Sequence, residues 1–368
     1  MPAQFLAWLM TTFAFVMPLI FGQPTTAPDT RVAPIVEEMP DYGVWPTEEF
    51  EIGEAPLWLP TSLLRPAYFL RGLLNEGSQN HGIVALYKGK IVYEWYADGW
   101  DKDKPHDMFS ATKSITSALV GIAIADGFID SVDDTFVKYY PDAVIEIDAE
   151  PKQQITIQQM LTMTSGLGGD NDDVYAGIRP LITGEEDMKA IDERFEKDDA
   201  KTTFELCSMV VKPGERWNYS TLCSGLLLGL VARVIDQPLE DYVDEKLFGP
   251  MGITNYQWYK WADGVYRGGS GLNLTPRDMA KFGYLYLNWG RWDGQQLVPA
   301  DWIAQSIPAS KAFKAYGYQF WNKPYTPFIG AYEANGYANQ LIGIFPGQDL
   351  VIARTGTASV SFNFNLAF

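Results

Sequence analysis

Hydrophobic and polar positions alternate near both ends of the chain and follow helical spacing between them. The run GIVALYKGKIVYEWYADG, residues 82–99, alternates on either side of Lys88-Gly89-Lys90 and predicts a β-hairpin. Further strands are predicted in YGYQFW, ANQLIGIF and DLVIARTG, with Pro346-Gly347-Gln348 as the turn between the last two. We therefore expect one sheet made from both ends of the chain.

The middle of the chain, from about 130 to 300, shows mostly helical and loop patterns, and a further helix is predicted over 60–75. Residues 113–129, KSITSALVGIAIADGFI, carry apolar side chains on all faces, so this helix should be buried. The pattern predicts an α+β hydrolase domain over 58–368. Its sheet region covers about 58–112 and 301–368, and its helical region covers about 113–300. An extended lead-in rich in Pro, Thr and Glu precedes it at 23–57.

The composition of the chain argues against several classes of function. The 368 residues are 47% hydrophobic, enough for a large core. A net charge of −18 argues against nucleic-acid binding and against an anionic membrane surface. With two histidines and no tight acidic loop, neither a metal site nor a cofactor is predicted.

The first residues indicate export. The apolar stretch from Phe5 to Phe21 suits a secretory signal, and residues 1–22 are predicted to be removed from a periplasmic or secreted protein. An N-terminal membrane anchor is the alternative, although two threonines and Pro18 interrupt a span at the short limit. We expect no stable membrane span in the mature chain. In an oxidising compartment Cys207 and Cys223 are expected to form a disulfide; in the cytosol they would be buried thiols.

The candidate nucleophile is Ser110, in the sequence Ser110-Ala111-Thr112-Lys113 at the start of the buried helix. Residues three apart share a helix face, so Lys113 is placed to activate the serine hydroxyl. A lysine in the first turn of a buried helix is costly unless it is paired or neutral. The alternative is an N-cap serine beside a solvated lysine. A Ser-His-Asp site is disfavoured because His81 and His106 are the sole histidines and no G-x-S-x-G sequence occurs.

A second candidate segment is PGERWNYSTLCSGLLLGLVARVI, in which Tyr219-Ser220-Thr221 directly precedes an apolar helix. A tyrosine near a lysine cation loses its proton more easily and acts as a base. The alternative is a core tyrosine followed by a capping serine or threonine.

With these motifs in view, the chain resembles the serine β-lactamase and penicillin-recognising superfamily. More closely, it resembles the branch of class C β-lactamases, related esterases and 6-aminohexanoate-dimer hydrolases. The resemblance covers roughly 80–356 and implies a largely antiparallel sheet, flanked by terminal helices, beside an all-helical region. It rests on the following stretches, in family order: MFSATKSITSALVGIAI, ITIQQMLTMTSGL, PGERWNYSTLCSGLLLGLVARVI, GGSGLNLTPRDMAKFGYLYLNWGRWDG and NGYANQLIGIFPGQDLVIARTG.

The resemblance implies a role for each matched residue. Ser110 is the expected acylated nucleophile and Lys113 its proton acceptor or relay. Tyr219 matches the tyrosine of the family's Tyr-x-Asn element and would shuttle protons to the leaving group. The backbone N–H groups of Ser110 and Tyr337 would form the oxyanion hole.

The chain departs from the family pattern at two places. Thr221 stands where the family has asparagine, and Ala334-Asn335-Gly336 stands where β-lactamases have Lys-Thr-Gly, so a carboxylate-binding lysine is missing. Hairpin counting puts Arg354 opposite about Leu341, near the rim, although an edge arginine is the simpler interpretation. We expect Thr221, Asn335, Gly336 and Arg354 to contact substrate. The resemblance also implies a closing helix where the sequence ends at Phe368; either that helix is missing or the sequence is incomplete.

These observations predict an exported serine hydrolase that acts through an acyl-enzyme on a small ester, amide or peptide-like substrate. A β-lactamase or D-alanyl-D-alanine carboxypeptidase-type enzyme is the alternative. A non-catalytic relative that binds peptidoglycan or another partner is the alternative of a different class, and the presence of all three catalytic residues argues against it.

Overall fold

The structure is a computed structural model that describes residues 42–59, 79–174, 184–308, 310, 313–322 and 330–357. The predicted signal segment at 1–22, the helix expected over 60–75 and the end of the chain at Phe368 lie outside these residues.

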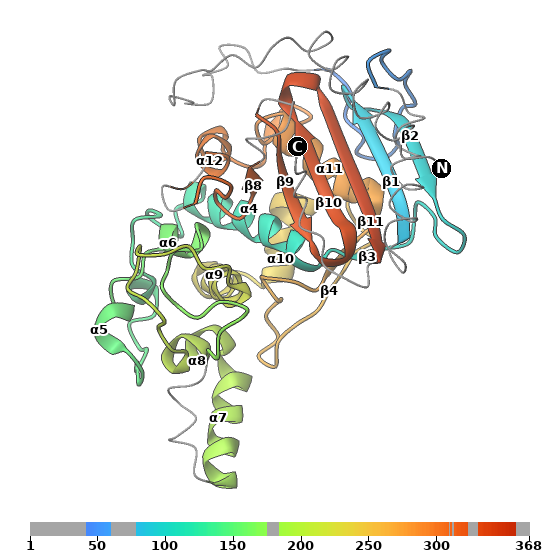
Figure 1. Ribbon diagram of the computed structural model, residues 1–368. Coiled ribbons are helices and arrows are strands. Elements are labelled where there is room, and N and C mark those ends of the chain that lie inside the picture. Colours follow the sequence, from blue (N-terminus) through green and yellow to red (C-terminus); the bar gives the residue numbers. More distant parts are fainter. Residues whose placement is uncertain are drawn as a thin grey trace, which may run out of the picture.

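One six-stranded antiparallel sheet joins strands from the first and last parts of the described chain, as predicted (Figure 1). The hairpin turns at Lys88 and Gly89, whose φ angles of +50° and +80° suit a tight two-residue turn. Leu341 lies opposite Arg354, which confirms the counted register. Across the sheet the strands are β2 (Lys90–Tyr96), β1 (Gln79–Tyr87), β11 (Leu350–Thr357), β10 (Gln340–Phe345), β9 (Tyr332–Gly336) and β8 (Trp321–Asn322).

Helix α11 (Pro276–Leu287) covers one face of the sheet. It begins at Thr275, whose side chain accepts a hydrogen bond from the Asp278 N–H, and Pro276 occupies the first turn. Gly283 allows close packing, because a β-carbon there would lie 2.5 Å from Val351 Cγ1. The residues nearest to Gly283 on the sheet are Val351, Ile342 and Ile344, which are apolar and whose side chains point toward α11.

Helices α4 to α9 form a second region beside the sheet (Figure 1). Helix α4 (Thr112–Ala125) is buried from Thr112 to Ala123, as its all-round apolar pattern predicted, and it packs on α9 (Thr221–Val234). The other helical segments and short strands are β3 (His106–Asp107), η1 (Phe109–Ala111), η2 (Phe136–Tyr139), α5 (Ala149–Lys152), α6 (Ile157–Leu161), α7 (Glu185–Lys197), α8 (Asp199–Leu206), α10 (Leu239–Val243), η4 (Asp244–Phe248), β4 (Gln257–Trp258), β5 (Leu272–Leu274), β6 (Arg291–Trp292), β7 (Gln295–Gln296), α12 (Ala300–Ser306), η5 (Tyr337–Asn339) and η6 (Pro346–Gln348).

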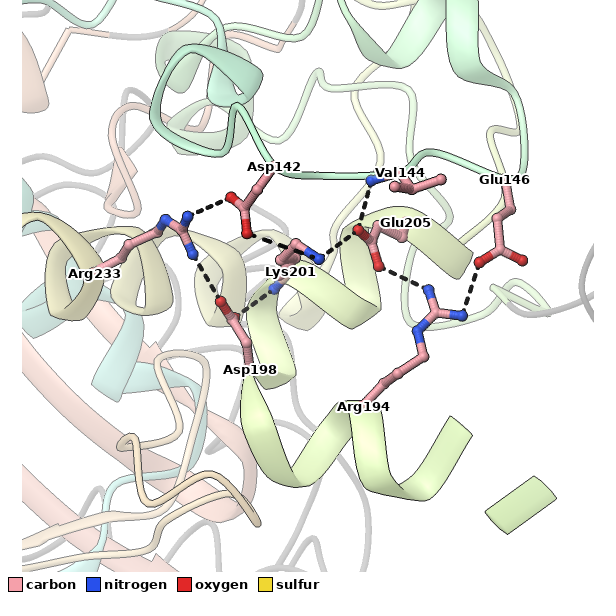
Figure 2. A network of polar contacts seen from close by, with 8 residues as sticks. All are labelled: Asp142, Val144, Glu146, Arg194, Asp198, Lys201, Glu205 and Arg233. Atoms are coloured by element: carbon pink, nitrogen blue, oxygen red, sulfur yellow. Dashed lines mark hydrogen bonds and ion pairs between the residues drawn. The ribbon is translucent and has the colours of Figure 1, made fainter. Parts of the chain in front are cut away.

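Ion pairs attach α7 and α8 to the rest of the helical region (Figure 2). Helix α7 has no buried residue and projects from the body, so its anchoring depends on polar contacts. Arg194 bridges Glu146 and Glu205, with 2.8 and 2.7 Å between the paired atoms. Burial tends to raise the pKa of Glu205, but hydrogen bonds from Lys201, the Val144 N–H and Arg194 outweigh burial and keep it below its usual value. Glu205 is therefore charged, and both of its carboxylate oxygens have partners that hold α7 and α8 in place.

Within the described ranges, no single helix has both the length and the apolar composition of a membrane span. The pair Thr221–Val234 and Leu239–Phe248 passes that test jointly, but its two parts meet at a bend of 98°.

Candidate active site

Ser110 lies directly before α4, in the short helix η1. The preceding residue, Phe109, has a φ of +46°, a conformation that costs a non-glycine residue energy. The Asp107 carboxylate offsets this by accepting a hydrogen bond of 2.7 Å from the Phe109 N–H. The turn from β3 into α4 therefore presents the Ser110 side chain in a defined direction.

The ammonium nitrogen of Lys113 is buried beside Ser110. The residue is 1% exposed, and its Nζ lies 3.0 Å from Ser110 Oγ, 3.0 Å from Thr221 Oγ1 and 2.8 Å from the Gly269 carbonyl oxygen. Burial lowers the pKa of Lys113 to about 8, although the nearby Asp170 and Cys223 raise it. A substantial share of the amine is thus neutral near pH 8 and able to accept a proton.

Tyr219 completes the group. Its hydroxyl is hydrogen-bonded to Ser110, and its ring centroid lies 4.9 Å from Lys113 Nζ. Burial raises the pKa of Tyr219 well above its usual value, more than the hydrogen bond with Ser110 lowers it. The sequence-based expectation that the lysine cation eases loss of the phenol proton is therefore wrong for the resting site. Burial therefore favours the protonated form of the Tyr219 phenol.

Thr221 enters the site at the first turn of α9. Its hydroxyl lies 3.0 Å from Lys113 Nζ and 2.8 Å from Asp170 Oδ2. Asp170 and Gly269 were not identified from the sequence. They reach Lys113 and Thr221 across long separations in the chain. Asp170 lies outside the stretches that carry the family resemblance, and Gly269 lies inside one of them without being singled out as a site residue.

The end of β9 approaches the turn at Ser110 closely. At Gly336 a β-carbon would lie 2.1 Å from the Met108 carbonyl oxygen and 3.1 Å from the Ala111 nitrogen. The next residue, Tyr337, packs its ring edge-on against Phe109, with 5.6 Å between centroids. The structure thus brings the backbone of Gly336 and Tyr337 alongside the Ser110 turn.

Asn335 and Arg354 share one row on the sheet, since both lie opposite Leu341. Ile342, the next residue of β10, faces α11, so this row faces away from α11. Asn335 Nδ2 donates to Glu333 Oε1 at 2.8 Å, and Arg354 Nε donates to the Asn339 carbonyl at 3.2 Å. Arg354 therefore supports the turn that follows Gly336.

The two histidines form a pair of their own. His81 Nδ1 and His106 Nε2 are 2.9 Å apart, and Trp100 stacks on His81 at 4.2 Å. Burial lowers the pKa of His81 to about 4 and also lowers that of His106. His106 Nδ1 faces the Asp107 carbonyl, so the pair supports the turn before Ser110.

Cys207 and Cys223 are both buried free thiols, so the predicted disulfide is wrong. Cys223 instead contacts Ser165, with 3.1 Å between Sγ and Oγ, and the Cys207 thiol faces the Phe204 carbonyl. An even cysteine count in a chain expected to be exported did not establish a bond.

Replacing Gly336 with alanine is expected to lower kcat on a p-nitrophenyl ester by about 100-fold or more, because the added methyl group displaces β9 from the Ser110 turn. The control is Gly225→Ala in α9, where a β-carbon meets nothing within 4 Å. Steady-state kinetics and thermal unfolding of both variants test this. Wild-type kcat in Gly336→Ala would show that this close approach is not required.

Comparisons with known proteins find the same fold in several solved structures. A solved structure from Bacillus anthracis, provisionally described as a 6-aminohexanoate-dimer hydrolase, has a TM-score of 0.67 at 21% identity and covers 89% of this chain and 87% of its own. A family VIII carboxylesterase has a TM-score of 0.62 at 16% identity, covering 84% and 94%. The 6-aminohexanoate-dimer hydrolase of Paenarthrobacter ureafaciens is 23% identical over 62% of this chain, and the match spans 57% of that protein.

The solved structures share the fold, a mixed α/β arrangement with an antiparallel sheet. The family described as Beta-lactamase matches residues 73–362, which include every element of the site. This chain is a member of the Beta-lactamase family.

Proposed function

We propose that the protein is a serine hydrolase that cleaves ester or amide bonds through an acyl-enzyme, with Ser110, Lys113 and Tyr219 as its catalytic residues. The observation that carries this proposal is the buried Lys113 amine, 3.0 Å from Ser110 Oγ, with a pKa near 8. A neutral amine in that position accepts the hydroxyl proton as the serine attacks.

In the proposed reaction, Ser110 Oγ bonds to the substrate carbonyl carbon while its proton passes to Lys113. The resulting oxyanion is held by the backbone N–H groups of Ser110 and Tyr337, which the approach of Gly336 to the Ser110 turn supports. Tyr219 gives its proton to the leaving oxygen or nitrogen as that bond breaks, and it recovers a proton through Lys113. In the second half, water attacks the acyl carbon and loses a proton to Lys113. That proton passes to Ser110 Oγ as its bond to the acyl carbon breaks, which releases the acid.

The substrate class we favour is esters and simple amides, rather than β-lactams. The strand position that holds the family's lysine carries Ala334, and the next residue, Asn335, is hydrogen-bonded to the carboxylate of Glu333. A carboxylate on the substrate thus meets an acidic neighbour instead of a cation. Arg354, which contacts the Asn339 carbonyl, lies two strands away in the same row.

On one preparation, kcat/KM for p-nitrophenyl butyrate is expected to exceed that for a chromogenic cephalosporin by a few orders of magnitude. One charged hydrogen bond contributes about 1.5–3 kcal/mol, or roughly 10- to 150-fold, and the site lacks both the lysine and the asparagine amide. The comparison is a pair of initial-rate measurements. A cephalosporin value equal to or above the ester value would contradict this preference, and Arg354→Ala would then show whether Arg354 supplies the missing cation.

A further inference from the structure

The hydrogen bonds of Asp170 connect it to the proposed catalytic groups. Its backbone N–H donates to the Tyr219 carbonyl at 2.9 Å. Its Oδ1 accepts from the Thr221 N–H at 2.6 Å, and its Oδ2 accepts from the Thr221 hydroxyl at 2.8 Å. One exposed aspartate therefore holds both the backbone and the side chain of the segment that opens α9.

These contacts determine the direction of the hydrogen bonds around Lys113. An ionised carboxylate only accepts, so the Thr221 hydroxyl donates its single proton to Asp170. The lone pairs of Thr221 Oγ1 then remain to accept from Lys113 Nζ at 3.0 Å. The Gly269 carbonyl, at 2.8 Å, accepts a second N–H.

A neutral lysine amine has two N–H groups and one lone pair. With both N–H groups directed at Thr221 and Gly269, the lone pair faces the third neighbour, Ser110 Oγ. A hydroxyl not held by Asp170 can instead point its proton at the amine and occupy that lone pair. An asparagine amide oxygen, which the family has at this position, only accepts; threonine needs a partner to set its direction.

We propose that Asp170 is a positioning residue: through the Thr221 hydroxyl it orients the Lys113 amine so that its lone pair faces Ser110. This inference rests on the proposed serine-hydrolase function. Asp170 touches no reacting atom itself and acts through two hydrogen bonds in series.

Asp170 also has an electrostatic effect that gives the proposal a second readout. The groups that act on the Lys113 pKa are Asp170 and Cys223, which raise it against the larger lowering by burial. The ring of Tyr219 lies on the remaining side. Removing the Asp170 charge lowers the Lys113 pKa, so the rise of kcat/KM with pH moves to lower pH.

The discriminating variant is Asp170→Asn. Its oxygen still accepts from the Thr221 N–H, so the start of α9 is kept. Its NH₂ group, however, donates to the Thr221 hydroxyl, which reverses the direction of the hydrogen bonds from residue 170 through Thr221 to Lys113. We expect kcat to fall roughly 10- to 100-fold with little change in KM. The midpoint of the pH profile should shift below the wild-type value.

Asp172→Asn is the matched control, because it removes the same charge from the same loop. Asp172 accepts from the Gly169 N–H and from Asn218 rather than from Thr221. Its kcat and pH midpoint should stay near wild type. Equal losses in the two variants would overturn the proposal.

Thr221 variants test the series arrangement. Thr221→Val, which has the same shape without a hydroxyl, should lose activity as Asp170→Asn does, and Thr221→Ser, which keeps the hydroxyl, should lose less activity than Thr221→Val. In the Thr221→Val background, Asp170→Asn should lower kcat little further, because the hydroxyl through which Asp170 acts is absent. Fully additive losses would show that Asp170 acts independently of Thr221.

A phosphonate inhibitor separates this inference from the function beneath it. Asp170→Asn should still take up one phosphonate per chain, more slowly than wild type. If wild-type protein takes up none, the serine-hydrolase proposal itself fails, whatever the Asp170 variants show.

Discussion

Replacing Ser110 with alanine is expected to lower ester turnover by several orders of magnitude and to abolish phosphonate labelling. No other group can form the acyl bond in the proposed reaction, and removal of a catalytic serine has costs of this size. The fold should survive, because Ser110 is only half-buried and its hydroxyl contacts Lys113 and Tyr219 alone among the interactions of the described residues. Intact-mass measurement after phosphonate treatment, beside ester kinetics, tests both statements.

Ser117→Ala is the control for this experiment. Ser117 lies on the same helix and is fully buried, and its hydroxyl has no hydrogen-bond partner among the described residues. That variant should label and turn over substrate as wild type does. Unit labelling of the Ser110→Ala protein would place the nucleophile elsewhere.

Lys113 and Tyr219 are expected to behave as one unit with Ser110. Lys113→Met and Tyr219→Phe should each lower kcat/KM by at least about 100-fold, and the double variant should be little worse than the poorer single variant. The structural reason is that both groups contact the same hydroxyl. If the fold-loss of kcat/KM in the double variant equalled the product of the two single fold-losses, a shared proton-transfer step would be contradicted.

The pH profile provides an independent test of the Lys113 assignment. Only the neutral amine accepts a proton, so wild-type kcat/KM should rise with pH through a midpoint near 8. This limb should vanish in Lys113→Met. A double His81→Gln, His106→Gln variant should keep most activity and the same midpoint, because the pKa of His81 lies near 4 and the pair contacts neither Ser110 nor Lys113 in the described residues. A folded but inactive double variant would indicate that a histidine takes part in the reaction.

Features set by local pattern were predictable from the sequence. The hairpin at Lys88-Gly89 follows from alternation around a glycine turn, and the buried helix after Ser110 follows from its apolar faces. The register of Leu341 against Arg354 follows from counting around one turn. The spacing of Ser110 and Lys113 on one helix face likewise depends on helix geometry alone.

Features set by distant segments were not predictable in this way. The contact of Lys113 with Gly269 and that of Thr221 with Asp170 join loops that no periodicity relates. The protonation of Tyr219 was misjudged because a nearby cation is visible in a motif, whereas the depth of burial that outweighs it is not. The cysteines illustrate the same limit, since Cys223 faces Ser165 from another segment.

The pairing of β1 with β11 also has a consequence for how the protein reaches its active state. Ile83 lies opposite Arg354, so the central strands of the sheet meet only after nearly the whole described chain is available. Contacts at such separations form slowly, because a long loop must close before they contribute any free energy. Helices α4 and α9 can form earlier, but the backbone of Gly336 reaches the Ser110 turn only when β9 joins the sheet. During refolding, ester hydrolysis should therefore return later than the helical signal.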